Sequence, residues 1–309
     1  MSRAFVFPGQ GAQAIGMGRA LAKAYPAAQA VFDAVDDALD QRLSVLIWEG
    51  DIADLTLTQN AQPALMATSM AALAALEAEG LGMAGVAFVA GHSLGEYSAL
   101  CAAGSLGLAD TARLLRVRGQ AMQAAVPVGV GAMAALLGLD LAAASDVAAE
   151  AAQGEVCQAA NDNDPAQVVI SGHTGAVERA IAIALAKGAR RALLLPVSAP
   201  FHCGLMQPAA AVMAEALAAV VIAAPLVPVV VNVRAEAVTE PDRIRALLVA
   251  QVTGMVRWRE SVLWMAGAGV TEAWEVGAGK ALSGMIRRTA PGVATRAVGT
   301  PEDVGAARG

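Results

Sequence analysis

The chain has 309 residues, of which 57% are hydrophobic, 16% are charged and only 4% are aromatic, and its formal net charge is −6. This composition excludes intrinsic disorder and provides enough apolar side chains for a large buried core. An acidic chain with no basic stripe is not typical of nucleic-acid binding, so we expect no nucleic acid among the partners.

The sequence predicts neither a membrane segment nor a signal peptide. Its most apolar stretch, Ala209–Val233, contains Glu215, Pro225 and Pro228, whereas a spanning helix needs about 20 uninterrupted apolar residues. The N-terminus leads directly into a short apolar run and a Pro-Gly turn, without the apolar region and cleavage site of a signal peptide. We therefore expect a cytoplasmic protein.

Neither a metal site nor a nucleotide site is indicated. Cys101, Cys157 and Cys203 are widely spaced and have no second Cys or His at ligand spacing, so we expect buried thiols and no metal. Gly9–Gly11 lacks the third glycine of a dinucleotide-binding fingerprint. Gly277–Lys280 lacks the upstream glycine and the following Ser or Thr of a phosphate-binding loop.

The first 90 residues alternate between strand and helix patterns. We expect a strand over Ala4–Phe7, then a Pro-Gly turn and a helical pattern broken near Pro26. Pro63 suits the first turn of a long helix that ends at Glu79, and Gly85–Ala90 has the composition of a short strand. This alternation predicts an α/β domain with a mostly parallel sheet and helices on both faces.

The segment between residues 131 and 197 has a different order of elements. The patterns predict strand, helix, strand, strand, helix and strand over Ala132–Leu137, Leu141–Gln153, Glu155–Ala160, Gln167–Ser171, Gly175–Lys187 and Arg191–Val197. This βαββαβ order is typical of a ferredoxin-like fold, which closes its own four-stranded sheet. We therefore expect residues 129–197 to form a subdomain inserted into a large domain made of residues 1–128 and 198–309.

Helix and strand patterns alternate again after this insert. They predict helices over Leu205–Val220, Asp242–Val252, Arg259–Gly267 and Lys280–Thr289, and strands over Val227–Val233 and Thr271–Val276. These elements complete the large α/β domain.

The sharpest chemical signal is the G-x-S-x-G sequence Gly91-His92-Ser93-Leu94-Gly95, which lies between the strand ending at Ala90 and a helical run over Glu96–Ala103. A tight turn from strand to helix needs glycines and exposes the serine hydroxyl at the carboxyl edge of the sheet. Ser93 is therefore the candidate nucleophile. The alternative is an ordinary Gly-Ser turn, because the five-residue pattern also occurs by chance.

A serine nucleophile needs a base, and the chain has three histidines. His92 adjoins Ser93 on the turn and points away from it, which suits a residue that lines a pocket. His173 lies in a polar turn of the expected insert. His202 follows a strand at the start of a helix, whose dipole favours a neutral imidazole, so we expect it to be the base. The alternative is a structural histidine that caps this helix.

Arg118 is conspicuous because it lies in the apolar stripe of its helix. Leu114, Leu115 and Met122 define that stripe at 100° per residue, while Arg113 lies on the opposite face. A buried guanidinium needs a partner. It is either paired with an internal Asp or Glu or available to an anionic ligand such as a carboxylate.

Four motifs together identify a resemblance that covers nearly the whole chain. They are Phe7-Pro8-Gly9-Gln10-Gly11-Ala12-Gln13, Gly91-His92-Ser93-Leu94-Gly95-Glu96-Tyr97, Arg118-Gly119-Gln120-Ala121-Met122 and Phe201-His202. In this order and spacing they resemble the malonyl-CoA:acyl-carrier-protein transacylases of bacterial fatty-acid synthesis. Weaker matches extend to Gln62-Pro63-Ala64, Asn161, Gln251 and the segment Glu275–Lys280.

The resemblance implies a hydrolase-like α/β domain with an inserted ferredoxin-like subdomain and an active site between them. In this family a serine takes the acyl group from coenzyme A and passes it to the phosphopantetheine thiol of an acyl carrier protein. The implied partners are malonyl-CoA and an acyl carrier protein. The coenzyme A thioester is a substrate, no cofactor is implied, and we expect a monomer.

The family roles carry over to matching positions of this chain. The resemblance implies Ser93 as nucleophile, His202 as base and Arg118 as the carboxylate-binding residue. The implied oxyanion hole consists of the backbone N–H groups of Gln10 and Leu94, and the backbone carbonyl of Gln251 orients the histidine. Three further residues are implied to contact substrate: His92, Asn161 and Phe201. The Phe201 ring would favour malonyl over α-branched groups, unless it only packs the strand–helix junction.

Three other functions are compatible with part of the pattern. A serine esterase of the α/β-hydrolase type shares the G-x-S-x-G turn, but it expects an Asp or Glu and then a His after the serine. A non-enzymatic carrier-protein docking subunit would have no use for Ser93, His202 and Arg118. A trans-acting polyketide malonyltransferase, or the malonyltransferase of a malonate decarboxylase, has the same motifs as the fatty-acid enzyme.

Overall fold

The larger of two sheets is built from short strands, of which those at its centre are apolar and largely buried. The structure, a computed structural model that describes residues 2–308, orders this sheet β10-β9-β1-β2-β7-β8. Its strands are β1 (Ser2–Phe7), β2 (Val86–Gly91), β7 (Val229–Val231), β8 (Glu236–Val238), β9 (Val270–Val276) and β10 (Ala294–Val298). All neighbours are parallel except β7 and β8. The expectation of a mostly parallel α/β sheet is therefore confirmed.

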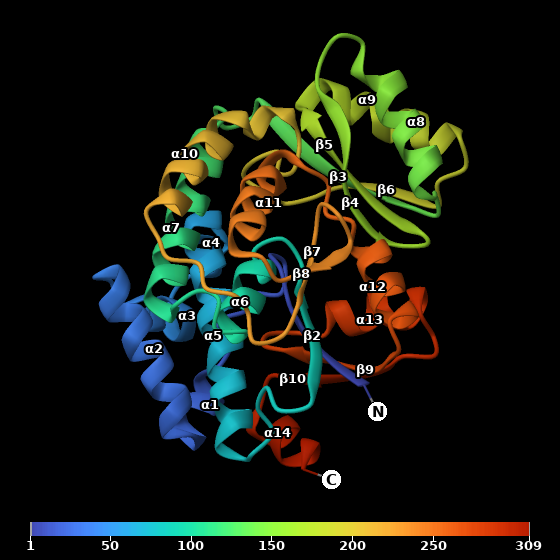
Figure 1. Cartoon of the computed structure of the whole chain (residues 1–309). Helices are drawn as coiled ribbons and strands as arrows, with labels where there is room; N and C mark the ends of the chain where they lie inside the picture. The colour runs from blue at the N-terminus through green and yellow to red at the C-terminus, as the bar shows by residue number, and fades with distance from the viewer. Residues whose placement is uncertain (1, 309) are drawn as a thin grey trace.

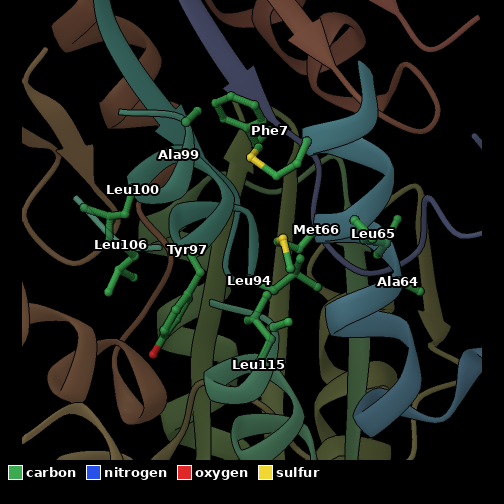
Figure 2. Packing of buried hydrophobic residues seen from close by; sticks show 14 of the residues in the cluster. Phe7, Ala64, Leu65, Met66, Leu94, Tyr97, Ala99, Leu100, Leu106 and Leu115 are labelled. Atoms are coloured by element: carbon green, nitrogen blue, oxygen red, sulfur yellow. The ribbon is translucent and has the colours of Figure 1, made fainter. Parts of the chain in front are cut away.

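Helices cover both faces of this sheet, and β1 shows why. Its side chains alternate, so Phe5 and Phe7 enter one hydrophobic core while Ala4 and Val6 enter another. Figure 2 shows Phe7 in the first core, together with residues of the neighbouring helices. The helices of the larger unit are α1 (Arg19–Ala24), α2 (Pro26–Leu39), α3 (Leu43–Glu49), α4 (Ile52–Thr56), α5 (Thr58–Ala78), α6 (Gly95–Ala102), α7 (Leu108–Ala124), α10 (Gln207–Ala218), α11 (Pro241–Thr253), α12 (Trp258–Gly267), α13 (Ala281–Thr289) and α14 (Pro301–Ala307).

The second sheet is formed by the middle of the chain and is antiparallel, in the order β4-β5-β3-β6. Its elements are β3 (Gly131–Leu137), α8 (Leu141–Ala152), β4 (Cys157–Asp164), β5 (Gln167–His173), α9 (Thr174–Ala186) and β6 (Arg191–Leu194). Apolar residues of both helices and of all four strands contribute to a separate core. Figure 1 shows this unit at the upper right, beyond the carboxyl end of the larger sheet.

Several expected boundaries are wrong. Pro63 is not in the first turn of its helix, because α5 already begins at Thr58. The strand expected to end at Ala160 continues to Asp164, and the strand expected to reach Val197 ends at Leu194. Both misplaced segments in α5 and β4 are polar yet buried, so they lack the apolar periodicity on which the expectation depended.

The last third of the chain also differs from expectation. The strands β8 and β10 and the helix α14 were not expected, because they are short and only partly apolar. The strand expected over Val227–Val233 is limited to Val229–Val231. The helix expected from Leu205 begins at Gln207, after a 3-10 turn over Gly204–Met206. No helix within residues 2–308 is long and apolar enough to cross a membrane.

The C-terminal half of β4 joins the two units. The N–H of Asp162 donates to the carbonyl of Val256, whose own N–H donates to the carbonyl of Ala160, both at 2.9 Å. The buried carboxylates of this strand also pair with arginines of the larger unit: Asp162 with Arg259, and Asp164 with Arg288. β4 therefore places its polar residues directly beside the carboxyl edge of the large sheet.

Candidate active site

Ser93 lies on the tight turn between β2 and α6. Its backbone has a φ of 54°, a left-handed conformation that non-glycine residues seldom adopt. A Cβ on Gly91 would lie 1.9 Å from the carbonyl carbon of Gly95, and a Cβ on Gly95 would lie 2.3 Å from the carbonyl oxygen of Phe7. The turn therefore requires both glycines and holds Ser93 at the end of the sheet.

His202 contacts the hydroxyl of Ser93 directly. The distance from Ser93 Oγ to His202 Nε2 is 2.7 Å. On the other side of the ring, Nδ1 lies 2.9 Å from the carbonyl oxygen of Gln251 and 3.2 Å from that of Gly254. Carbonyl oxygens only accept hydrogen bonds, so Nδ1 carries the proton and Nε2 is free to accept the serine proton.

The neutral state of His202 has a different cause from the one expected. Burial, followed by the positive charge of Arg118, lowers its pKa to about 3. The helix dipole is not the reason, because α10 begins only at Gln207. The capping alternative is wrong as well, since both ring nitrogens are engaged by Ser93 and by the carbonyls of Gln251 and Gly254.

Arg118 is buried beside this pair, with 1% of its surface exposed. Its Nη1 donates to Gln62 Oε1 at 2.7 Å, and its Nη2 donates to Gln251 Oε1 at 2.8 Å and to Ser93 Oγ at 3.2 Å. Within residues 2–308 no carboxylate forms an ion pair with it, so the alternative of an internal Asp or Glu partner is wrong. Neutral oxygens therefore orient this cation, and no described carboxylate is in direct contact with it.

A cavity of ≈530 Å³ opens onto these groups between the two sheets. It is lined by Gln10, Gly11, Gln13, Ile52, Thr56, Gln62, His92, Ser93, Leu94, Arg118, Met122, Met133, Asn161, Leu195, Pro196, Val197, Phe201 and His202. A larger hollow of ≈660 Å³ lies over α1, α2 and α3, but it is lined mainly by charged and polar side chains and its lining includes no histidine. Chemistry rather than size identifies the candidate site.

Similarity to known proteins identifies the family of this chain. A model of the acyl transferase domain matches residues 4–289. The chain belongs to the acyl transferase domain family. A protein of Bacillus subtilis named malonyl CoA-acyl carrier protein transacylase is 47% identical over 302 residues, covering 97% of this chain and 94% of the relative. A protein of the same name from Escherichia coli is 47% identical over 304 residues, covering 98% of each chain. The resemblance inferred from the motifs is thereby confirmed.

Solved structures of family members have the same fold. An acyl-carrier-protein-S-malonyltransferase from Bartonella henselae is 55% identical, with a TM-score of 0.97 and coverage of 99% of this chain and 98% of that one. A malonyl-transacylase solved in complex with a type II polyketide-synthase acyl carrier protein is 40% identical, with a TM-score of 0.96 and 99% coverage of both chains.

The acyl transferase fold brings the remaining expected residues together. His92 is half-buried. Its ring centroid lies 5.8 Å from that of Trp258 at an interplanar angle of 59°, and its Nε2 lies 2.8 Å from Asn163 Oδ1. Burial lowers its pKa. Asn161 and Phe201 line the cavity, whereas Gln251 lies behind Ser93, Arg118 and His202.

The two expected oxyanion donors lie on adjacent turns. Gln10 is on the loop after β1, where its side-chain Oε1 accepts a hydrogen bond from Thr58 Oγ1 at 2.9 Å, and Leu94 follows Ser93. The hydrogen bonds described among residues 2–308 leave the backbone N–H groups of Gln10 and Leu94 without a protein acceptor. Both residues line the cavity, so these donors are available at its edge.

Sequence analysis missed three polar residues that support the site: Gln62, Glu96 and Asn232. Gln62 and Glu96 lie inside the quoted motifs, yet no role was assigned to either. Asn232, at the end of β7, accepts the N–H of Ser93 at 2.8 Å through its Oδ1. Nothing in its local sequence indicates this contact, because the partners are 139 positions apart.

His173 does not belong to the site. It ends β5, and its Nδ1 accepts the backbone N–H of Val156 at 2.9 Å. The three cysteines are free and lie outside the cavity lining. Residues 2–308 contain no group of three or more His, Cys, Asp or Glu side chains placed to hold a metal ion.

Proposed function

We propose that this protein is a malonyl-CoA:acyl-carrier-protein S-malonyltransferase that works through an ester on Ser93. The observation that carries the proposal is Arg118, a buried cation that forms no ion pair within residues 2–308 and lies 3.2 Å from the hydroxyl of a serine that contacts a neutral histidine. A nucleophile with its base fits acyl transfer, and the adjacent cation fits an acyl group that ends in a carboxylate. The relatives' names agree with this activity.

In the first half-reaction, His202 Nε2 takes the proton from Ser93 Oγ as that oxygen attacks the thioester carbonyl of malonyl-CoA. The N–H groups of Gln10 and Leu94 stabilise the oxyanion of the tetrahedral intermediate. The intermediate collapses as its C–S bond breaks, and the departing coenzyme A sulfur takes the proton from His202. The product is malonyl-Ser93 and free coenzyme A.

The second half-reaction uses the same groups in the reverse order. His202 accepts the proton of the phosphopantetheine thiol of an acyl carrier protein, and the resulting thiolate attacks the malonyl ester. The C–O bond to Ser93 breaks, and the serine oxygen recovers a proton from His202. The acyl donor is a thioester and the acceptor is a thiol, so the transfer requires no cofactor. We retain the expectation that it acts as a monomer.

The substrate-contacting residues divide into two functions. Arg118 pairs with the malonyl carboxylate, and Phe201 limits the space at the acyl α-carbon. His92 and Asn161 also line the cavity, and the contact between His92 and Asn163 links the nucleophile turn to the smaller unit. The backbone carbonyl of Gln251 keeps the His202 ring in the tautomer that both half-reactions need.

We also propose a domain division for this chain. The large domain is hydrolase-like and consists of residues 1–128 and 198–309, and the ferredoxin-like subdomain consists of residues 129–197. The separate core and the sheet order β4-β5-β3-β6 support this division. The active site then lies between the two units, where residues from both line one cavity.

An esterase function has less support. A triad of the hydrolase type needs a carboxylate at His202 Nδ1, whereas two backbone carbonyls occupy that position. A polyketide or malonate-decarboxylase role remains compatible with the same chemistry, and the carrier protein captured by the enzyme distinguishes these pathways.

Intact-protein mass spectrometry after brief exposure to malonyl-CoA tests the proposal. We expect a malonyl adduct on the wild type, none on Ser93→Ala, and release of the adduct when a carrier-protein thiol is supplied. An adduct that still forms on Ser93→Ala would overturn the assignment of the nucleophile. An adduct lost to water before any thiol is added would favour an esterase.

A further inference from the structure

Glu96 is a buried carboxyl group that the proposed mechanism does not use. It lies in the first turn of α6 with 1% of its surface exposed. Its Oε2 accepts two hydrogen bonds, one from Gln251 Nε2 at 2.9 Å and one from the backbone N–H of Asn232 at 3.0 Å. No arginine, lysine or histidine described within residues 2–308 forms an ion pair with it.

The contact with Gln251 determines which way that amide group points. Gln251 Nε2 also donates to the carbonyl oxygen of Ser93 at 2.9 Å, so both acceptors draw the NH2 group to one side. The amide oxygen must then face the other side, where it accepts Arg118 Nη2 at 2.8 Å. A reversed amide would place an NH2 group against the guanidinium, and Arg118 would lose this hydrogen bond.

The contact with Asn232 fixes the turn that carries the nucleophile. With its backbone bonded to Glu96, the Asn232 side chain accepts the N–H of Ser93 through Oδ1 and donates to the carbonyl of Gly91 through Nδ2. These bonds hold Ser93 in its left-handed conformation. One carboxyl oxygen thus supports both the nucleophile turn and the cation beside it.

We propose that Glu96 is a positioning residue for malonyl selectivity, which orients the Gln251 amide so that Arg118 is held where the acyl carboxylate arrives. This inference rests on the malonyltransferase function proposed above. Glu96 acts through Gln251 and does not itself line the cavity.

The role proposed for Glu96 requires a hydrogen-bond acceptor, whether or not the carboxyl group is charged. Burial raises the pKa of Glu96 to about 7, so at neutral pH the group is only partly ionised. Its Oε2 accepts both hydrogen bonds in either state, provided that the proton sits on Oε1. A glutamine at this position would offer one amide oxygen to the same two donors.

The test compares acylation of Ser93 by malonyl-CoA and by acetyl-CoA in the full-length enzyme. Glu96→Met keeps the side-chain length but removes the acceptor, and we expect the malonyl-to-acetyl ratio of kcat/KM to fall about tenfold because Arg118 loses its alignment. Glu96→Gln restores the acceptor, and we expect a ratio within about threefold of the wild type. A wild-type ratio in folded Glu96→Met would overturn the proposal.

A double-mutant cycle separates positioning from general damage. In an Arg118→Ala background, Glu96→Met should leave the malonyl-to-acetyl ratio unchanged, because the cation that it aligns is gone. If Glu96→Met instead lowers the malonyl-to-acetyl ratio in the Arg118→Ala background by the same factor as in the wild type, Glu96 acts elsewhere. Glu275→Gln is the matched control: this buried carboxylate accepts the N–H groups of Leu282 and Ser283 in α13, so the ratio should not change.

Gln251→Met tests the same proposal if Glu96→Met does not fold. It removes the side-chain amide but keeps the backbone carbonyl that contacts His202, and we expect the same fall in the ratio. A wild-type ratio in this variant would also overturn the proposal. If the wild type itself forms no malonyl ester on Ser93, the proposed function fails; if it does and the ratios do not move, only the inference about Glu96 fails.

Discussion

At the scale of single residues, burial makes His202 a base that stays unprotonated far below neutral pH. Its pKa is lowered to about 3, so its protonation removes the base only in strong acid. We expect kcat/KM for acylation of Ser93 to be level as the pH falls from about 8 to about 5, and to decline only as it approaches 3. Rapid-quench acylation at controlled pH measures this, and an acid limb centred near 6.5 would contradict it.

Arg118 determines which acyl group is accepted. Arg118→Ala removes a charge-assisted contact that contributes about 1.5 to 3 kcal/mol, so malonyl transfer should fall by roughly 10 to 150 times. Acetyl transfer should hold or rise, because an acetyl group makes no use of the cation. Steady-state kinetics with both thioesters measures the change. Equal losses with both substrates would mean that Arg118 has only a structural role.

Phe201 borders the cavity with 8% of its surface exposed, and it also packs against the main hydrophobic core. Phe201→Ser should raise kcat/KM for methylmalonyl-CoA relative to malonyl-CoA, because a smaller side chain leaves room for the α-methyl group. One methyl group in a pocket contributes about 1 to 3 kcal/mol, which sets the size of the change. An unchanged ratio in a variant that remains folded would place selectivity elsewhere, for example at His92.

Residue types explain which site residues the sequence could predict. Ser93, His202 and Arg118 stand out because a glycine-flanked serine, a scarce histidine and an arginine in an apolar stripe are locally unusual. Asn232 is not unusual in its local sequence, and its role depends on a bond to the turn 139 positions away. The tertiary fold, not the local pattern, makes such a residue functional.

At the scale of secondary-structure elements, α5 and α7 approach each other closely enough to require a glycine. A Cβ on Gly119 would lie 2.4 Å from the Cα of Gln59 and 2.7 Å from the carbonyl oxygen of Thr58. Gly119→Ala should therefore push α7, which carries Arg118, away from α5. We expect a loss of about 1 to 3 kcal/mol in the free energy of unfolding and slower malonyl transfer.

Gly267→Ala is the control for this helix contact. Gly267 ends α12, and a Cβ there would meet no atom within 4 Å. Alanine favours a helix over glycine, so stability should be unchanged or rise by up to about 1 kcal/mol. Urea denaturation of both variants measures the difference. Equal stabilities for Gly119→Ala and Gly267→Ala would show that α5 and α7 can separate without cost.

Element boundaries could be predicted where periodicity is clean and not where polar residues are buried. The apolar runs of β1, β2 and β9 were expected close to their true limits. The start of α5 was missed because Thr58, Asn60 and Gln62 are polar although they are buried, and two of them, Thr58 and Gln62, contact Gln10 and Arg118 of the site. Function rather than local propensity selected those side chains.

At the scale of the whole molecule, the order of elements predicts an inserted unit but not how that unit is attached. The attachment depends on β4, whose Asn161 lines the cavity and whose Asn163 contacts His92. Nothing in the βαββαβ pattern indicates that the polar end of this strand continues into the larger unit. The position of one wall of the active site is therefore a property of tertiary contacts.

The ion pair between Asp162 and Arg259 is more buried than the second ion pair of β4, between Asp164 and Arg288. Arg259 Nε and Nη2 both lie 2.9 Å from Asp162 Oδ2, and the Asp162 side chain is only 1% exposed. Burial raises the pKa of this carboxyl group, while Arg259 opposes that rise. Removing the arginine would leave a buried charge without its partner, which costs more than losing a pair on the surface.

Arg259→Ala should therefore lower the free energy of unfolding by about 1 to 3 kcal/mol, which is less than for a fully buried pair because Arg259 is partly exposed. The difference from the wild type should narrow as the pH falls, since protonation of Asp162 removes the charge that Arg259 neutralises. Urea denaturation at several pH values measures both effects. Arg243→Ala is the control: its exposed pair with Glu236 should contribute at most about 1 kcal/mol.

The variant Arg259→Ala also distinguishes two effects on acyl transfer: a displaced cavity wall and a loss of carboxylate recognition. A displaced β4 changes the wall that every acyl group meets, so Arg259→Ala should slow malonyl and acetyl transfer by the same factor. Arg118→Ala, in contrast, should change the ratio between them. A changed ratio in Arg259→Ala would mean that β4 also sets the position of Arg118, although none of the hydrogen bonds of that guanidinium reaches the smaller unit.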